Sequence, residues 1–379
     1  MSELTWRDLR PARGAIHIHT AYCDGGGDVA EILDAARETR TEFVALSDHD
    51  APYALRDGWA GWQTGAAPAG AERGGRVPDL VDERRVLVLV GTELRTREHH
   101  DLLAIGPTVP VATRDLDTPE AVRLLKSLGA AVFVVHPQGC RQMLSGAYRH
   151  AWSAWDLPEY DGIEIWDYMH DWVRALRLRR LPRMCRHPEA FIHGPEPEIL
   201  AAWDEVARTR PLAGLSGLDV HAKRLPWGLD RWAPWARGGV LPYARTFAAL
   251  AHYALVPGPW TGNAARDTQA VAASLAAGRG WTAREELAPG RAFRFRLREG
   301  DNAYPPGARV PLAAGQVLEI ESPHPARLRL VGGGAIKAET EGTRLAHAPR
   351  LPGAYRAEGY LDGQAWVFTN HIYVREPGE

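Results

Sequence analysis

Imidazole and carboxylate side chains follow five short apolar segments in the first 225 residues of this 379-residue chain. These side chains are His17 and His19, Asp48 and His49, Glu93, His136, and Asp219 and His221. In parallel α/β folds the carboxyl ends of the strands gather at one edge, where binding sites are built. Histidine and carboxylate ligands suit Zn²⁺, Mn²⁺ or Fe²⁺, and three cysteines are too few for a thiolate-rich site. The sequence therefore predicts a metal centre at this edge.

The spacing and the number of these residues predict a cluster of ions. Residues i and i+2 of a strand point to the same side, so His17 and His19 can serve one site, as can Asp219 and His221. A single histidine at a strand end is more often a surface or core residue than a ligand, but five such strand ends in one region are not explained that way. The candidate ligands exceed the four positions of one tetrahedral ion, so we expect two or three divalent ions.

The elements that must position these residues are short apolar strands separated by helical patterns. The expected strands span 14–19, 42–47, 86–91, 101–106, 130–135, 162–166 and 212–217. Asp28 is expected to cap a helix with Glu31 as its capping-box partner, and Pro119 to take the first position of a helix that ends near Gly129. Further helical patterns lie at 197–208 and 270–280. This alternation indicates a parallel sheet, open or closed into a barrel.

The pattern changes near residue 285, where helical periodicity gives way to segments of period two separated by Gly, Pro and Asp-Gly turns. Such segments at short spacing are typical of an antiparallel sandwich. We therefore expect two domains, 1–285 with the metal chemistry and 286–379 as a small β-sandwich. The stretch 51–80, rich in Gly, Ala and Asp, is expected to be a surface insertion.

Composition excludes several classes of function. Lys and Arg number 45 against 47 Asp and Glu, so the net charge of −2 gives neither the basic field of a nucleic-acid binder nor a polybasic membrane signal. Three cysteines cannot build a disulfide framework, and no run approaches the ~20 apolar residues of a membrane span. The first ten residues lack the apolar core of a signal peptide. We expect a cytoplasmic protein without nucleic-acid or membrane partners, whose oligomeric state, including a homo-oligomer, stays open.

The motifs HIHTAYCDGGG, LSDHD, GTELRT, VVHPQG and GLDVHAK, in this order, resemble the PHP (polymerase and histidinol phosphatase) superfamily over about residues 14–225. The C-terminal WVFTNHIYVRE resembles the tail of its CehA/McbA-like branch. The resemblance implies a distorted (β/α)7 barrel with a trinuclear metal site, here followed by the small C-terminal antiparallel β-sandwich. The implied metal ligands are His17, His19, Asp24, His49, Glu93, His100, His136, Asp219 and His221.

Two of these ligands depart from the family pattern. Asp24 lies in Cys-Asp-Gly, where the family more often has Ser-Asp-Gly, and the carboxylate is retained. The family tends to place a histidine about five residues before the glycine of an apolar strand, and counting back from Gly106 reaches Asp101, which follows His99 and His100. Either the register shifts by one and His100 is the ligand, or Asp101 takes that place. We expect His100.

Other polar residues near these motifs have two interpretations each. Asp48 is expected to support a ligating histidine from behind, because such histidines commonly need a carboxylate or carbonyl partner. Lys223 could meet an anionic group of a substrate or simply be solvated. Glu164, Asp167 and His170 follow an expected strand, and they could contact substrate or form an ordinary polar strand end.

These features predict a metal-dependent hydrolase, most simply a phosphoesterase acting on a small anionic phosphate ester. A water bridging two ions would lose a proton and attack, while a third ion with His221 and Lys223 would neutralise the developing charge. The alternatives are a carboxylic ester, carbamate or amide hydrolase with the same centre, and a non-catalytic metal-containing binding module. A serine nucleophile is not expected, because the sequence has no G-x-S-x-G motif.

Overall fold

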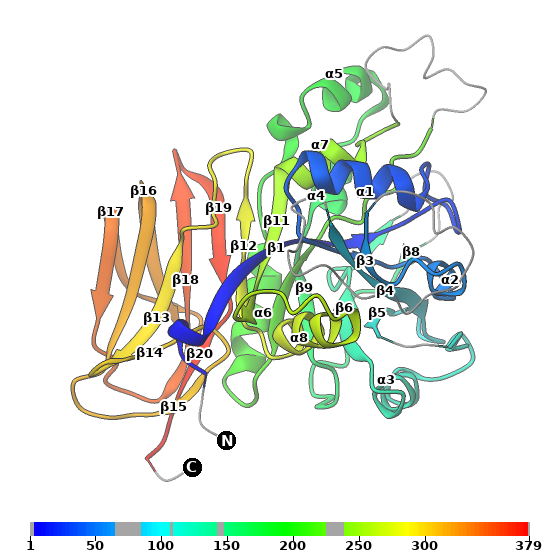
Figure 1. The fold of residues 1–379 in the computed structure, drawn as a ribbon. Helices are drawn as coiled ribbons and strands as arrows, with labels where there is room; N and C mark the ends of the chain where they lie inside the picture. Colours follow the sequence, from blue (N-terminus) through cyan, green and yellow to red (C-terminus); the bar gives the residue numbers. More distant parts are fainter. Residues whose placement is uncertain (1–3, 65–84, 107–108, 142–147, 225–238, 378–379) are drawn as a thin grey trace.

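The computed structural model describes residues 4–64, 85–106, 109–141, 148–224 and 239–377, which form a mixed α/β fold around one large sheet. Helices surround the strands on one side of the molecule, whereas the other side consists of strands (Figure 1). The helices are α1 (Val29–Glu38), α2 (Tyr53–Arg56), α3 (Thr118–Ser127), α4 (Tyr168–Arg174), α5 (Leu181–Arg186), α6 (Pro197–Ala207), α7 (Tyr243–Ala249) and α8 (Ala264–Ala276). Among the described helices, none has the length and apolar character needed to cross a membrane.

The strands of the helical part pair with one another in a closed circuit. They are β1 (Leu9–Ile18), β2 (Phe43–Leu46), β3 (Gly61–Gln63), β4 (Val86–Arg95), β5 (Asp101–Ile105), β6 (Ala131–Val135), β9 (Gly162–Asp167), β10 (Ala213–Gly217) and β11 (Leu250–Pro257), with a separate short hairpin of β7 (Cys140–Arg141) and β8 (Tyr148–Arg149). The chain pairs β1 with β2, β2 with β4, and then β5, β6, β9 and β10 in succession. Beyond β10, hydrogen bonds from Leu218 N to Ile16 O and from His19 N to Val220 O lead back to β1.

Local sequence explains most of these elements. Every residue of β2 and of β6 is buried, as continuous apolar runs predict for strands covered on both faces. Asp28 caps α1 by accepting a hydrogen bond from Glu31 N at 2.9 Å. A capping box at α3 is formed by Asp117 with Glu120, so Pro119 takes the second helical position and the prediction of the first was wrong. The cause is the Asp117 carboxylate, which starts the helix one residue earlier.

The expectation of a parallel sheet was wrong for β5, and the sequence had not predicted β11 as a strand. Strand β5 runs antiparallel to both β4 and β6, and β11 runs antiparallel to β1. Only residues 96–100 connect β4 to β5, which is too short for the crossover that two parallel neighbours require. As a consequence, the amino end of β5, and not its carboxyl end, lies at the edge that carries the predicted ligands.

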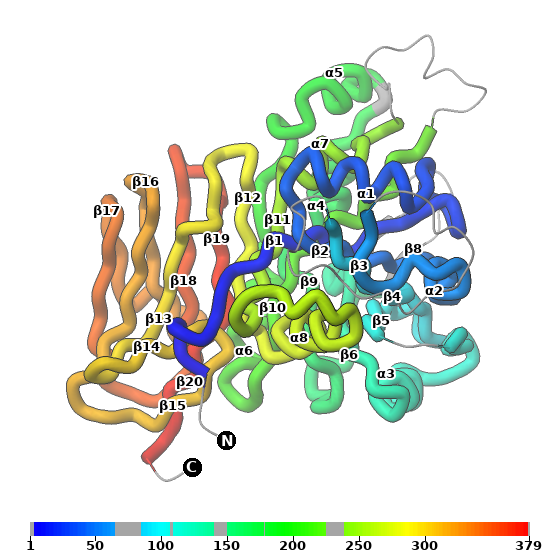
Figure 2. The backbone as a smooth tube through the Cα atoms, in the orientation of Figure 1, coloured from blue at the N-terminus to red at the C-terminus, as the bar shows by residue number. Residues whose placement is uncertain are grey.

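The C-terminal strands continue this sheet beyond β11. They are β12 (Gly280–Arg284), β13 (Arg294–Glu299), β14 (Asn302–Tyr304), β15 (Arg309–Pro311), β16 (Val317–Gly332), β17 (Ala335–His347), β18 (Gly353–Leu361), β19 (Gln364–Thr369) and β20 (Ile372–Arg375). Strand β12 pairs with β11 on one side and with β19 on the other. Figure 2 shows the same continuity, because β12 (yellow) and β19 (red) lie between the helical part and the outer strands.

Alternating burial along β13 and β16 confirms the predicted period of two in this part. The period-two segments 316–322 and 326–334 mostly fall within the single strand β16, and the segment 366–374 is divided into β19 and β20 at Asn370 and His371. Trp281 of β12 shares one apolar core with Phe293 and Trp366. Of the expected insertion 51–80, residues 65–80 lie outside the described residues, and the remainder contains α2 and β3.

Candidate metal centre

Four predicted ligands converge on one point with the spacing of a tetrahedral site. The Nε2 atoms of His17 and His19 lie 3.5 and 3.3 Å from Glu93 Oε2, and 3.4 and 3.2 Å from Asp219 Oδ1. For metal–ligand distances of about 2.0–2.2 Å, the corners of a tetrahedron are about 3.3–3.6 Å apart. All four residues are buried. The observed separations therefore fit one divalent ion at the centre of this group.

The buried atoms that face this point lack other partners. Among the described residues, His17 Nε2, His19 Nε2 and Asp219 Oδ1 form no hydrogen bond, although each atom is shielded from solvent. Buried polar atoms are nearly always hydrogen-bonded, because an unsatisfied one costs about 1–3 kcal/mol. Atoms that coordinate an ion are the ordinary exception. This observation supports metal binding independently of the distances.

Backbone geometry at this point is more irregular than simple strand alternation. The register between β1 and β2 shifts between Ile16 and Ile18, and His17 has a φ of 65°. His136 and Asp219 also have positive φ values, of 50° and 44°. Non-glycine residues in this conformation are uncommon, and they cluster at functional sites, where the surrounding structure holds them in place. The bulge at His17, and not strand periodicity alone, turns both histidines of the HxH motif to the same point.

Glu93 links this first group to a second one. While its Oε2 faces His17 and His19, its Oε1 lies 3.3 Å from His136 Nε2. A ligand atom of Asp101 lies within 4.8 Å of ligand atoms of both Glu93 and His136. Asp101 begins β5, and the antiparallel direction of this strand brings its first residue to the site.

His100 contacts hydroxyl and aromatic side chains. Its Nδ1 lies 2.9 Å from Thr118 Oγ1, its Nε2 lies 3.4 Å from Ser153 Oγ, and its ring packs against Trp152 with 4.8 Å between centroids. Its neighbour Asp101, in contrast, lies within the group of Glu93 and His136. At this position the structure therefore brings Asp101 to the metal centre and places His100 among aromatic and hydroxyl side chains.

A third group adjoins the first through His19. Ligand atoms of His19, Asp24, His49 and His221 all lie within 4.8 Å of one another. Asp24 Oδ1 is 3.1 Å from His221 Nε2 and 3.7 Å from His49 Nε2, so the carboxylate retained in the Cys-Asp-Gly motif lies among the predicted ligands. Asp24 is the most exposed member of this group, which is consistent with a position at the mouth of the site.

Glu164 and Asp167 hold the predicted histidine ligands His17 and His136 from behind. Glu164 Oε1 lies 2.8 Å from His17 Nδ1, and Glu164 Oε2 accepts a hydrogen bond from His136 N at 3.1 Å. Asp167 Oδ2 lies 2.8 Å from His136 Nδ1. Such partners fix the tautomer and orientation of a ligating ring. A Cβ at Gly217 would lie 1.6 Å from Glu164 Oε1, so a larger residue here would displace this carboxylate from His17.

Sequence reasoning had left Glu164 and Asp167 between substrate contact and ordinary polar strand end, and their orienting role was missed. The signal was present in the chain, since both acids lie toward the carboxyl end of β9, as the predicted ligands do on their own strands. His170, expected with them, has its Nε2 3.5 Å from Glu196 Oε1. That contact gives His170 a carboxylate partner outside the ligand groups given above.

Asp48 and Lys223 occupy different positions around the third group. Asp48 is buried and accepts hydrogen bonds from Thr20 N at 2.8 Å and from Cys23 Sγ at 2.9 Å, so it fixes the turn after β1 that carries Asp24. Lys223 Nζ is 2.8 Å from Asp24 Oδ2, with 57% of its side chain exposed. The ammonium group is therefore both close to the predicted ligands and accessible to an anion from solvent.

The carboxylates give the centre an excess of negative charge that cations can balance. Burial by itself lowers the pKa of His17, but Glu164 and Asp219 outweigh it and raise the pKa to about 9. Burial raises the pKa of Asp219, but the histidines around it, His221 first, hold it well below its usual range. Burial also raises the pKa of Asp24, but the contact with His221 outweighs it and holds this pKa below its usual range. Divalent cations would compete with protons for the same nitrogen atoms.

The solved structures that are similar to this chain include two proteins of bacterial origin. One is a two-domain protein from Bacteroides vulgatus that contains a predicted PHP-like metal-dependent phosphoesterase, with 13% identity over 98% of each chain and a TM-score of 0.41. The other is a candidate metal-dependent phosphoesterase from Bifidobacterium adolescentis, with 16% identity over 57% of this chain and 91% of that chain and a TM-score of 0.35. No protein-family model and no curated protein matches the sequence. At these low identities and TM-scores, neither likeness supports a conclusion about chemistry, which rests on the geometry of the site.

Proposed function

We propose that this chain is a metal-dependent hydrolase of the PHP superfamily that binds two or three divalent ions and acts on a small-molecule phosphate ester. The observation that carries the proposal is the set of adjoining ligand groups, which share His19 and Glu93. Three cations would match the three non-bridging oxygens of a phosphate monoester. Mn²⁺, Zn²⁺ and Fe²⁺ all suit the mixed histidine and carboxylate donors.

The residues of this chain have distinct proposed parts in the reaction. When bound, the divalent ions would lower the pKa of a water molecule and polarise the phosphoryl oxygens. Glu93 would contribute one carboxylate oxygen to each of two adjoining ligand groups, because its Oε2 faces His19 and its Oε1 faces His136. Lys223, beside Asp24, would bind the anionic group of the substrate and stabilise charge that develops on it, whereas His221 would contribute as a ligand of the adjoining group.

For the second ion we propose Asp101, in place of the expected His100, as the ligand beside Glu93 and His136. Support comes from the proximity of the Asp101 carboxylate to both residues and from the contacts of His100 with Thr118. Arg95 Nε lies 2.7 Å from Asp101 Oδ1 and so holds this carboxylate in place.

We further propose that the circuit β1–β2–β4–β5–β6–β9–β10 is the distorted (β/α)7 barrel, with β5 as the source of the distortion. The C-terminal strands would form the β-sandwich that follows a boundary near residue 285. Pairing of β12 with β19 makes the junction a continuous sheet, so the two parts would move little relative to each other. Membership of the CehA/McbA-like branch stays a prediction from the C-terminal motif.

A direct test combines metal analysis with paired substrates. Purified full-length protein should contain stoichiometric transition metal by mass spectrometry. After loading with Mn²⁺ or Zn²⁺, it should hydrolyse p-nitrophenyl phosphate faster than p-nitrophenyl acetate or a p-nitrophenyl carbamate. Asp219→Asn should lose metal and activity while remaining folded by circular dichroism. Asp161→Asn, which alters a carboxylate that is bound to Lys126 and lies outside the ligand groups described above, is the matched control.

The outcomes separate the candidate functions. Faster hydrolysis of the carboxylic ester or carbamate would replace the phosphoesterase with the second hydrolase class at the same centre. Stoichiometric metal without turnover of any of these esters would support the non-catalytic binding module. Absence of stoichiometric metal, together with no activity after loading, would refute the metal centre itself.

A further inference from the structure

A cavity of about 320 Å³ lies where the end of α6 meets the turn between β16 and β17 and the segment that connects β17 to β18. Its volume is at the lower end of the usual range for small-molecule sites. Because α6 connects the parallel strands β9 and β10, its last residues lie near the amino end of β10, opposite to the end that leads to Asp219. The cavity is therefore separate from the metal centre.

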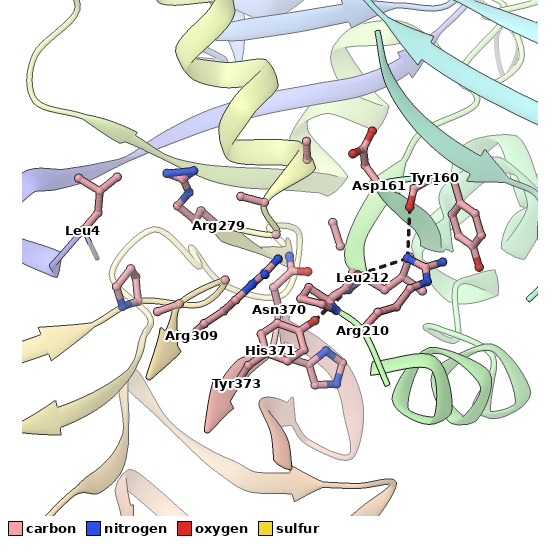
Figure 3. A pocket seen from close by; sticks show the side chains of 18 of the residues that line it. Leu4, Tyr160, Asp161, Arg210, Leu212, Arg279, Arg309, Asn370, His371 and Tyr373 are labelled. Atoms are coloured by element: carbon pink, nitrogen blue, oxygen red, sulfur yellow. Dashed lines mark hydrogen bonds between the residues drawn. The ribbon is translucent and has the colours of Figure 1, made fainter. Parts of the chain in front are cut away.

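The charged side chains among the described residues that line this cavity are all cationic, and they are Arg208, Lys337 and Arg350. His347 adds an imidazole. The larger cavity of about 720 Å³ in Figure 3 differs, because Glu159 and Asp161 line it together with its arginines. An anion in the smaller cavity would therefore meet positive charge without a carboxylate in the same wall.

Lys337 and Arg350 are available to a ligand. Both side chains belong to exposed residues, and neither forms a hydrogen bond or an ion pair with the described residues. Arg208 is different, because its Nη1 lies 3.1 Å from Glu205 Oε2 in an exposed pair whose charges offset each other. Two uncompensated positive charges therefore remain in the lining of this cavity.

Two buried carboxylates of the neighbouring elements, Asp204 of α6 and Glu358 of β18, bind the guanidinium of Arg356 at 2.7 and 2.6 Å. Side chains alternate along a strand, so Arg356 points to the opposite face of β18 from Tyr355, which lines the cavity. On that opposite face, two negative charges and one positive charge leave a single net negative charge. The two uncompensated cations of the cavity exceed it.

A β-bulge places Lys337 at this cavity. The register between β16 and β17 shifts between Leu330 and Val331, so Lys337 is an extra residue without a partner on β16. Bulges commonly direct a side chain away from the regular pattern of a strand. A Cβ on Gly332 would lie 3.2 Å from Lys337 Cε and 2.8 Å from the ring of Tyr355. The glycine therefore leaves room for the stem of this lysine beside the tyrosine ring.

The cavity also has an apolar side, formed by Leu351 and Pro352. Leu351 is 70% exposed, which is the largest exposure among the large hydrophobic residues that the structure describes. The hydroxyl of Tyr355 donates a hydrogen bond to Leu351 O at 2.7 Å, so the segment that carries Arg350 and Leu351 is tied to β18. An apolar group of a ligand would remove this leucine side chain from water.

From this combination we infer a second binding site, separate from the metal centre, for a small phosphate monoester with an apolar body. Its phosphate would bind to Lys337 and Arg350, because ammonium and guanidinium groups form charge-assisted hydrogen bonds with phosphate oxygens. Two uncompensated cations match a doubly charged phosphate better than a single carboxylate. The apolar body would cover Leu351 and Pro352.

The test uses the full-length protein treated with EDTA, so that bound metal does not take up the probe. The probes are phenylphosphonate and methylphosphonate, whose carbon–phosphorus bond is not an ester and whose anionic groups are alike. Each is titrated into the protein and followed by isothermal calorimetry. We expect saturable binding with one site per chain, tighter for phenylphosphonate because its ring covers Leu351. Lys337→Ala and Arg350→Ala should each weaken binding by about tenfold or more, the usual effect of losing a hydrogen bond to a charged group.

Three control variants locate the probe, and each should leave the affinity unchanged. Arg344→Ala removes an exposed arginine of β17 that does not line the cavity. Lys223→Ala alters the rim of the metal centre, and Arg309→Ala alters the cavity in Figure 3.

Three results would overturn the inference. Loss of binding in Lys223→Ala or Arg309→Ala, with Arg350→Ala unaffected, would place the probe at the metal centre or in the larger cavity. Equal affinities for the two phosphonates would remove the apolar body from the proposed ligand. Absence of saturable binding of either probe up to about 10 mM would leave no site of useful affinity.

Discussion

Glu164 offers a sharp test of how the metal centre is held, because both of its carboxylate oxygens accept hydrogen bonds from donors. Oε1 faces His17 Nδ1 at 2.8 Å, and Oε2 faces His136 N at 3.1 Å. Glu164→Gln keeps the shape of the side chain but leaves one acceptor oxygen and one NH₂ group. In either orientation of the amide, one of the two donors then faces another donor.

The expected loss of metal affinity in Glu164→Gln follows from the hydrogen bond that is lost. A hydrogen bond to a buried charged group contributes about 1.5–3 kcal/mol. Loss of the carboxylate partner of a ligating histidine typically weakens metal binding by about 10–100-fold, equivalent to about 1.4–2.8 kcal/mol. The two ranges agree, so we expect Glu164→Gln to weaken metal binding by about one to two orders of magnitude without removing a ligand.

Metal affinity can be measured by competition with a chromogenic chelator, and folding by circular dichroism. The matched control is Glu321→Gln on β16, a partly exposed carboxylate that pairs with Arg296 at 3.0 Å. A Glu164→Gln protein whose metal affinity stays within about twofold of the wild type would show that Glu164 does not orient His17, and the reasoning from these contacts would fail.

Three further predictions test other parts of the structure. Asp101→Asn should lower metal content while His100→Ala keeps it, as measured by mass spectrometry; the reverse pattern would restore His100 as the ligand. Arg356→Met should lower the free energy of unfolding by about 3–5 kcal/mol in urea titrations, because it removes the cationic partner of the buried carboxylates of Asp204 and Glu358. A loss below about 1 kcal/mol would contradict this expectation. Metal-free protein should lose stability between about pH 6.5 and 9, as followed by denaturant titration. Burial lowers the pKa of His17, but its carboxylate neighbours raise it from 6.5 to about 9, so the stabilising proton is fully bound below pH 6.5 and lost through pH 9. Stability that is unchanged or rises over this interval would show that His17 is not protonated in the metal-free state.

Much of the fold could be predicted because local patterns specify it. The apolar runs of β2, β4 and β6 lie where continuous hydrophobicity places them, and the alternating pattern of β13 and β16 gives strands of period two. Caps such as Asp28 act within one helical turn, so sequence alone identifies them. The direction of β5 was not predicted, because it depends on which strands pair and not on the composition of the strand.

The sequence by itself determined which residue types follow each strand, and hence the presence of many histidine and carboxylate ligands in one region. Only the tertiary structure decided which atoms meet. It turned His17 into the site through a bulge, brought Asp101 to the edge by reversing β5, and placed Glu164 behind two histidines. The physical reason is that periodicity fixes the face of a residue within its own strand, whereas a shared ion requires distances between strands that only pairing, register and packing set.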